Sequence, residues 1–347
     1  MIYSIFPSRD ATIYENTQSA NTGIDEILEI SKVVSSSMEP GVFNSRILID
    51  FNTDEVSQSI GTGEITDTNG NDPKFFIKLF NLSQEQVPFN YTLAIAPVSE
   101  SWNMGLGKST HSPLTKEGVS WKYRDGYTPN TRWGSPGVAV PGGTTVTESG
   151  YVRTQSFDNM SADIDIDISA LVTSSFISGE LAYQNNGYLI QRSGSQETDG
   201  VRYGSLKFFS AETHTIYSPR LEVKWDDSTH ATGSLKALTA DNIIVKGTNI
   251  KSEYKEKSKI RIRLKGCEQY PTKSYATSTY SNSGYTTQYL NATSYYSIID
   301  MATGETIIHF DTSYTKISCD SQGNYFNLWT HSLLPERVYG IEVRLDN

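Results

Sequence analysis

The strongest constraint on the fold is a series of short segments in which apolar and polar residues alternate. "KFFIKLF" (74–80) is typical, because it is rich in aromatic and β-branched residues and is followed by Asn. A period of two places every second side chain on one face of a strand. The segments of this kind before residue 226 are 11–15, 27–32, 45–51, 74–80, 91–98, 188–193, 206–211 and 220–225. They predict a jelly-roll or other β-sandwich over residues 1–226, with one short helix capped by Ser169.

A second strand series follows a segment that lacks this period. Residues 227–239, "DSTHATGSLKALT", are expected to form a linker. The later alternating segments are 242–247, 258–266, 286–291, 295–300, 306–310, 325–330 and 337–345. A loop containing glycine should join 295–300 to 306–310 as a hairpin. Seven strands in roughly 110 residues is the size of an immunoglobulin-like sandwich, so we expect an all-β protein whose second domain spans 240–347.

Composition and charge exclude several classes of function. The formal net charge is −10, whereas proteins that mainly hold nucleic acid need clustered Lys and Arg. No segment approaches the ~20 apolar residues that span a bilayer, so neither nucleic acid nor membrane is an expected partner. The start, "MIYSIFPSRDATIYE", has no basic region followed by an apolar run, and we expect no signal peptide and synthesis in a cytoplasm. Cys267 and Cys319 are expected to be reduced thiols.

Three of the five tryptophans, Trp102, Trp121 and Trp133, lie in one irregular stretch. The stretch contains "GLGKST" (105–110), which ends like a phosphate-binding loop. The first glycine of that motif is missing, since Trp102 stands in its place, and Pro113 interrupts any helix that would follow. A nucleotide loop is therefore excluded.

Two interpretations of the tryptophans remain. Exposed indoles could stack on sugar rings, as in many carbohydrate-binding modules, and this requires at least one ring to face solvent. Alternatively, the rings fill the interior of a long loop that charge pairs hold in place. The candidate pairs join Glu100 or Asp125 to Arg124 or Arg132. The sequence favours the second interpretation, because a long loop must build a core of its own or stay mobile.

No constellation of residues predicts an enzyme or a cofactor. Asp163, Asp165 and Asp167 would share one face of a strand and make a weak candidate for calcium. The alternating isoleucines between them favour an apolar inner face and a solvated acidic outer face. The five histidines show no metal-ligand spacing, and no G-x-S-x-G nucleophile motif occurs. We therefore expect neither a metal nor a catalytic site.

The segment "LLPERVYGIEV" (333–343) is similar to the pattern before and along strand F of fibronectin type III domains. In that family a tyrosine at the position of Tyr339 has a structural role. The resemblance implies that the Tyr339 ring is buried and that its hydroxyl bonds back to the backbone near the preceding turn.

The first ~225 residues resemble the DNRLRE-type β-sandwich domain. The resemblance rests on "PSRDATIYE", "LEISK", "SRILIDFN", "FFIKLFN", the "SESW…GVSW" stretch and "YSPRLEVKW". In that family the tryptophan segment is mostly a feature of the fold. The C-terminal stretches "SKIRIRLKGCEQYPTKSY" and "YYSIIDMATGETIIHFD" look similar to virion structural proteins of large tailed phages, especially cyanophages.

These resemblances imply a non-enzymatic virion protein of the neck, collar, tail or an attached ring or fibre. It would be made in the host cytoplasm, and its partners would be other virion proteins and copies of itself in a symmetric oligomer. Residues 127–150 lengthen the tryptophan loop and would either reach a neighbouring subunit or cover their own sheet. The alternative is a protein that binds host surface glycan through the tryptophan loop.

Overall fold

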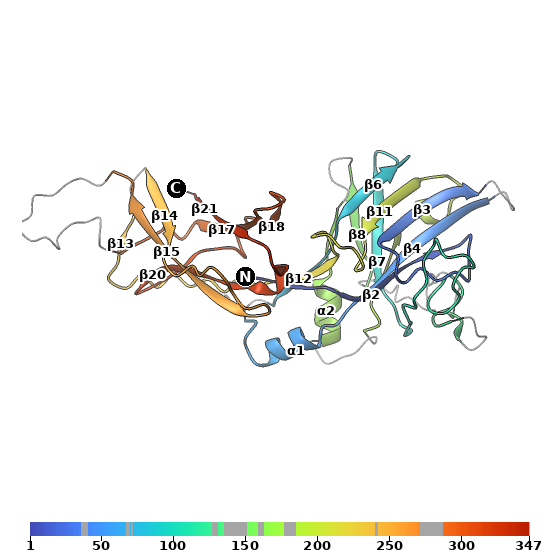
Figure 1. Cartoon of the computed structure of the whole chain (residues 1–347), viewed down its shortest axis with the longest axis horizontal. Helices are drawn as coiled ribbons and strands as arrows, with labels where there is room; N and C mark the ends of the chain where they lie inside the picture. The colour runs from blue at the N-terminus through green and yellow to red at the C-terminus, as the bar shows by residue number, and fades with distance from the viewer. Residues whose placement is uncertain are drawn as a thin grey trace, which may run out of the picture. The chain divides into compact units, whose positions relative to one another are not determined.

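The computed structural model is all-β, with curled sheets that form sandwich-like layers (Figure 1). It describes residues 1–35, 41–66, 70, 72–126, 131–134, 151–158, 163–176, 185–239, 242–270 and 287–346. The predicted all-β sandwich class is therefore confirmed. Within these residues, no helix has the length and apolar character that crossing a bilayer requires.

Contacts divide the chain into two compact units. The first unit comprises Ile5–Ser59 and Lys74–Glu222, and the second comprises Met1–Ser4, Ile60–Pro73 and Val223–Asn347. The sequence predicts that all of 1–226 belongs to the first domain. Three segments, 1–4, 60–73 and 223–226, are instead grouped with the C-terminal residues in the second unit.

The first unit is dominated by an eight-stranded sheet. Its order is β6 (Asn81–Glu85), β11 (Gly204–Phe209), β3 (Ile27–Ser35), β4 (Gly41–Phe51), β10 (Tyr188–Arg192), β7 (Tyr91–Pro97) and β8 (Arg153–Phe157), with β2 (Pro7–Tyr14) also beside β4. A separate four-stranded sheet has the order β1 (Ile2–Ile5), β12 (Arg220–Lys224), β5 (Lys74–Leu79) and β9 (Ile164–Asp167), of which β5 and β9 lie wholly in the first unit. The helices of this region are α1 (Asp54–Gly61), α2 (Ser169–Phe176) and α3 (Ser195–Thr198). All eight alternating segments lie on strands, and the expected helix is α2.

The second unit is a sandwich of two sheets. The larger has the order β13 (Lys236–Ala237), β16 (Gln288–Tyr289), β15 (Lys259–Glu268), β20 (Gly323–Trp329) and β19 (Ser318–Asp320), and β14 (Ile243–Gly247) also pairs with β15. The smaller has the order β18 (Thr306–Ile308), β17 (Ser294–Asp300) and β21 (Tyr339–Leu345). The rings of Tyr296 on β17 and Phe326 on β20 stack with centroids 4.1 Å apart, so the apolar faces of the two sheets meet there.

Two local predictions for the second unit can be compared with the structure. The predicted hairpin is confirmed, since β17 and β18 pair antiparallel and Gly304 in their loop has a φ of 76°. The expected linker is partly structured, because its residues 236–237 form β13 and pair with β16. The lack of an apolar period concealed this short strand.

Tyr339 connects the start of β21 to the turn before it. Its hydroxyl donates to the carbonyl oxygen of Leu334 at 3.1 Å and accepts from the Leu334 N–H at 2.8 Å. The ring is half-buried rather than fully buried. The two bonds fix the direction in which the chain enters β21.

The N-terminal ammonium of Met1 lies inside the second unit. It donates to the carbonyl oxygens of Trp225 and Tyr314, each at 2.5 Å, and lies 3.3 Å from a carboxylate oxygen of Asp227. The Trp225 N–H in turn donates to the Met1 carbonyl at 3.0 Å. Burial lowers the pKa of this ammonium, and Asp227 offsets part of that effect. The ion pair therefore joins β1 to the segment that follows β12.

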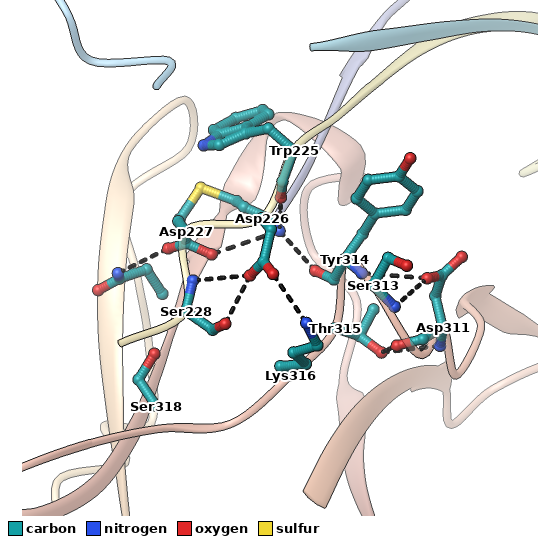
Figure 2. Close-up of polar contacts among 12 residues, drawn as sticks. Trp225, Asp226, Asp227, Ser228, Asp311, Ser313, Tyr314, Thr315, Lys316 and Ser318 are labelled. Carbon is teal, nitrogen blue, oxygen red and sulfur yellow. Dashed lines mark hydrogen bonds and ion pairs between the residues drawn. The ribbon is translucent and has the colours of Figure 1, made fainter. Parts of the chain in front are cut away.

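Figure 2 shows that the neighbouring Asp226 has a different set of partners. One carboxylate oxygen accepts from the N–H and the hydroxyl of Ser228, at 3.0 and 2.5 Å, and the other accepts from Lys316 Nζ at 2.8 Å. Burial opposes ionisation of Asp226, but the bonds from Lys316 and Ser228 outweigh it and lower the pKa. Adjacent aspartates thus neutralise two different cations.

Replacing Asp227 by alanine should destabilise the second unit. The variant leaves the Met1 ammonium buried without its carboxylate, and we expect the free energy of unfolding to fall by about 2 kcal/mol, because Asp227 is only partly buried. Chemical denaturation measures this change. Glu85→Ala is the control, since it removes an exposed ion pair to Lys207 and should cost no more than about 0.5 kcal/mol. Equal effects of the two variants would contradict the assigned role of Asp227.

Candidate functional site

The tryptophan stretch folds inward and builds a small core of its own, called here the tryptophan corner. Trp102, Trp121 and Trp133 are 4%, 5% and 4% exposed. They pack in one cluster with Ala11, Ile13, Leu48, Val98, Val119 and Leu189. None of the three indoles faces solvent, so they do not offer the exposed stacking surface that the glycan interpretation requires.

Two arginines lie over the indole rings. The Arg9 guanidinium is 4.4 Å from the Trp102 ring centroid, donates to the Trp102 carbonyl and forms an ion pair with Asp50 at 2.9 Å. The Arg46 guanidinium is 4.6 Å from the Trp121 ring centroid. A desolvated cation over an indole face contributes ~2 kcal/mol, so both contacts stabilise the corner.

The polar edges of the corner are also paired internally. Trp102 Nε1 donates to the Asn186 carbonyl at 2.8 Å, and Trp133 Nε1 donates to the Ser120 carbonyl at 2.9 Å. Of the charge pairs suggested by the sequence, the structure forms Arg124 with Glu100, at 3.6 Å. The lengthening of the loop, residues 127–150, lies largely outside the described residues.

Asn21 is the residue around which the loop is organised. Its Nδ2 donates to the carbonyl oxygens of Met104, at 2.6 Å, and Val119, at 2.8 Å. Its Oδ1 accepts from the N–H groups of Gly107, at 2.7 Å, and Gly23, at 3.3 Å. Asn21 is fully buried, and these four bonds satisfy its whole amide.

The glycines of "GLGKST" are explained by this close approach. A Cβ on Gly107 would lie 2.3 Å from the Asn21 carbonyl oxygen, and one on Gly105 would lie 2.5 Å from Asn21 Oδ1. Gly105 also has a φ of 77°, which favours glycine. The motif is therefore required by packing against Asn21.

Gly107→Ala should destabilise the first unit by about 3 kcal/mol, because the added methyl group overlaps backbone that cannot move independently. Thermal and chemical unfolding measure the loss. Gly200→Ala is a matched control, since a Cβ there meets nothing within 4 Å, and it should leave stability unchanged or slightly raised. If Gly107→Ala were as stable as Gly200→Ala, the packing explanation of the motif would be wrong.

Between the two constrained glycines, the loop displays an apolar side chain. Leu106 is 73% exposed. Its backbone is held through Gly105 and Gly107, and the next residue, Lys108, forms an ion pair with Glu26 at 3.3 Å. Leu106 is therefore an exposed side chain on a fixed backbone.

The three aspartates of the calcium candidate do not converge on one point. Asp163 Oδ1 accepts from the Asn81 N–H at 2.7 Å, and Asp167 Oδ1 accepts from the Ser169 N–H at 2.8 Å. Asp165 is exposed on β9, while Ile164, Ile166 and Ile168 are buried. In the described part of the chain, no group of three His, Cys, Asp or Glu residues is arranged to hold a metal ion.

Asp10 is a buried acid that the sequence did not single out. Its Oδ2 accepts from the Ala211 N–H at 2.7 Å, and its Oδ1 has no hydrogen-bond partner among the described residues. Burial is the main cause that raises the pKa of Asp10 to about 7, and the Ala211 bond opposes it. The signal in the sequence was weak, because an aspartate in a strand segment is usually placed on the solvent face.

The raised pKa of Asp10 predicts a pH-dependent stability. Between pH 3.8 and about 7 the folded state holds a proton that the unfolded state has released, so this carboxyl destabilises the fold as pH rises. Asp10→Asn removes the titration and keeps the acceptor for Ala211. Relative to wild type, its free energy of unfolding should improve by roughly 3–4 kcal/mol from about pH 4 to about pH 8.

Urea denaturation at several pH values tests this expectation. Glu117→Gln, which removes an exposed carboxyl, is measured in the same way as a control for the change of residue type. A difference for Asp10→Asn that is flat across this range would show that Asp10 ionises normally in the folded protein.

Comparisons with known proteins identify no family for this chain. No protein-family model matches the sequence, and no curated protein matches it significantly.

Proposed function

We propose that this chain is a non-enzymatic structural component of a tailed-phage virion, in the neck, collar, tail or an attached ring or fibre. The observation that carries the proposal is the tryptophan corner, where a buried aromatic core and Asn21 hold a loop that displays Leu106. Such a site is suited to burying an apolar anchor against another protein. The assembly is proposed to be a tailed-phage particle because the C-terminal stretches of the sequence resemble virion structural proteins of such phages.

The geometry of the corner supports an assembly role over sugar binding. The three indoles are at most 5% exposed, and the indole N–H groups of Trp102 and Trp133 donate to backbone carbonyls of the same unit. An interface formed by a preorganised loop loses less conformational entropy on binding than one formed by a mobile loop. Copies of the chain would thus be held in the particle by their buried interfaces, and they would catalyse no reaction.

The proposal is tested on purified tailed-phage particles whose genome encodes this chain. Mass spectrometry should find the chain in the particles at a constant copy number, and electron cryo-microscopy should place it in an ordered ring or fibre. A folded chain that is made in infected cells but absent from purified particles would refute the proposal.

Leu106→Asp should reduce incorporation of the chain into particles at least about tenfold, because it places a charge in the contact. Its thermal unfolding should match wild type, since the side chain is exposed in the free chain. Val201→Asp, at a side chain that is 52% exposed in the same unit, is the matched control and should be incorporated normally. Equal incorporation of both variants would exclude Leu106 as an anchor.

A further inference from the structure

Among the described residues of the second unit, the strand β21 is a long edge strand that is open to pairing. β21 contains seven residues and lies at the end of the sheet order β18-β17-β21. The opposite edge, β18, and the edge strand β19 of the facing sheet contain three residues each. Short edges are a common protection against pairing with other chains, and β21 lacks this protection.

The hydrogen bonds to β17 show which backbone groups of β21 point outward. All pairs of the two strands follow one register, from Tyr339 opposite Asp300 to Leu345 opposite Ser294. Just beyond the strand ends, Met301 N–H donates to the Val338 carbonyl and Asp346 N–H donates to the Thr293 carbonyl. Hydrogen-bonded pairs recur at every second residue of an antiparallel ladder.

By this parity, Gly340, Glu342 and Arg344 bond to β17, and the backbone groups of Ile341, Val343 and Leu345 face away from it. Among the described residues, the N–H groups of these three donate no hydrogen bond and their C=O groups accept none. Within the described part of the chain, β21 therefore presents a row of unpaired groups along its outer edge.

The same three residues carry the apolar side chains of the strand. Ile341, Val343 and Leu345 pack against the core of the second unit but remain half-buried. Tyr296 and Ile298, on the adjacent strand β17, are 2% and 1% exposed. A further strand beside β21 would cover the half-buried side chains and bond the free backbone groups at the same time.

The sequence of β21 is complementary to itself in an antiparallel register centred on Val343. In that register Val343 faces Val343 of the partner subunit, and Ile341 faces Leu345 of the partner subunit, so outward backbone groups meet outward backbone groups. On the other face of the sheet, Glu342 lies opposite Arg344 of the partner subunit, and by symmetry Arg344 lies opposite Glu342 of the partner subunit. Apolar pairs thus line the core side, and opposite charges line the outer side.

We propose that the β21 edge is an interface between two copies of this chain, formed by antiparallel β21–β21 pairing about a two-fold axis at Val343. The interface joins the two three-stranded sheets into one continuous sheet. This inference rests on the proposed assembly function and names one of its contacts.

The other long edge of the sandwich lacks this complementarity. Among the described strands β14 pairs with β15 alone, and Ile243 and Val245 are its core-facing residues. A two-fold register centred on Val245 sets Lys246 opposite Ile244 of the partner subunit, so the charge has no counterpart. Lysine on an edge strand is a common device against pairing, which makes Lys246 a suitable control position.

Charge exchange across the proposed interface provides the test. Glu342→Arg places two arginines opposite each other at both symmetric positions, and Arg344→Glu does the same with two glutamates. Each single variant should dimerise at least about tenfold more weakly than wild type in analytical ultracentrifugation. The double variant E342R/R344E should restore dimerisation, and an equimolar mixture of the two single variants should form heterodimers.

The controls separate pairing from folding. Arg344 lies 4.9 Å from the Tyr295 ring centroid, so thermal unfolding is measured for every variant, and Glu342→Arg alone, at an exposed side chain, should unfold like wild type. Lys246→Glu on β14 should leave dimerisation unchanged. Restored pairing in the double variant and in the mixture cannot result from a general loss of stability.

A wild-type chain that stays monomeric up to about 100 μM would overturn the inference, and so would single variants that dimerise as wild type does. Failure of the double variant and the mixture to dimerise would overturn it as well. The β21 edge would then have to pair with a strand other than β21 of a second copy. A monomeric chain that is nevertheless found in particles would leave the proposed function standing. A dimer that is absent from particles would refute the proposed function and leave this inference standing.

Discussion

The amide of Asn21 is the interaction on which the tryptophan corner depends. This side chain is 0% exposed and forms four hydrogen bonds to the backbone. Three of them reach the distant residues Met104, Gly107 and Val119, and the fourth reaches the nearby Gly23. A buried amide tolerates no missing partner, because each unsatisfied group costs about 1–3 kcal/mol. The loop must therefore adopt one conformation, and glycine is needed where it passes Asn21. This conformation of the loop sets the position of Leu106 between Gly105 and Gly107.

The regular part of the fold could be predicted from local sequence. Segments such as 45–51 and 258–266 alternate in hydropathy, and β9 buries Ile164, Ile166 and Ile168 as its pattern indicates. β6 and β8 were missed because "NLSQE" and "RTQSF" lie at sheet edges, where little apolar surface is buried. An edge strand receives its conformation from its neighbour's hydrogen bonds, and that information is absent from its own residues.

The candidate site was harder to predict for a related reason. The sequence showed three tryptophans and left open whether they face solvent or a core. That choice is made by residues such as Asn21 and Arg9, which lie about a hundred positions away and carry no periodic signal. The same applies to Asp10, whose pKa is raised by burial in the folded chain and which bonds to the distant Ala211 N–H. Local patterns specify strands well, whereas loops that pack through isolated polar contacts require the tertiary structure.

The position of Met1 has a consequence for the order of folding. Its ammonium bonds the carbonyl of Tyr314, 313 residues further along the chain, and Asp227 completes the contact. Closing so long a loop is entropically costly before other contacts have shortened it. The contact between Met1 and Tyr314 therefore needs both ends of this long loop in place. Met1 thereby connects residues 225–227 to residue 314 within the second unit.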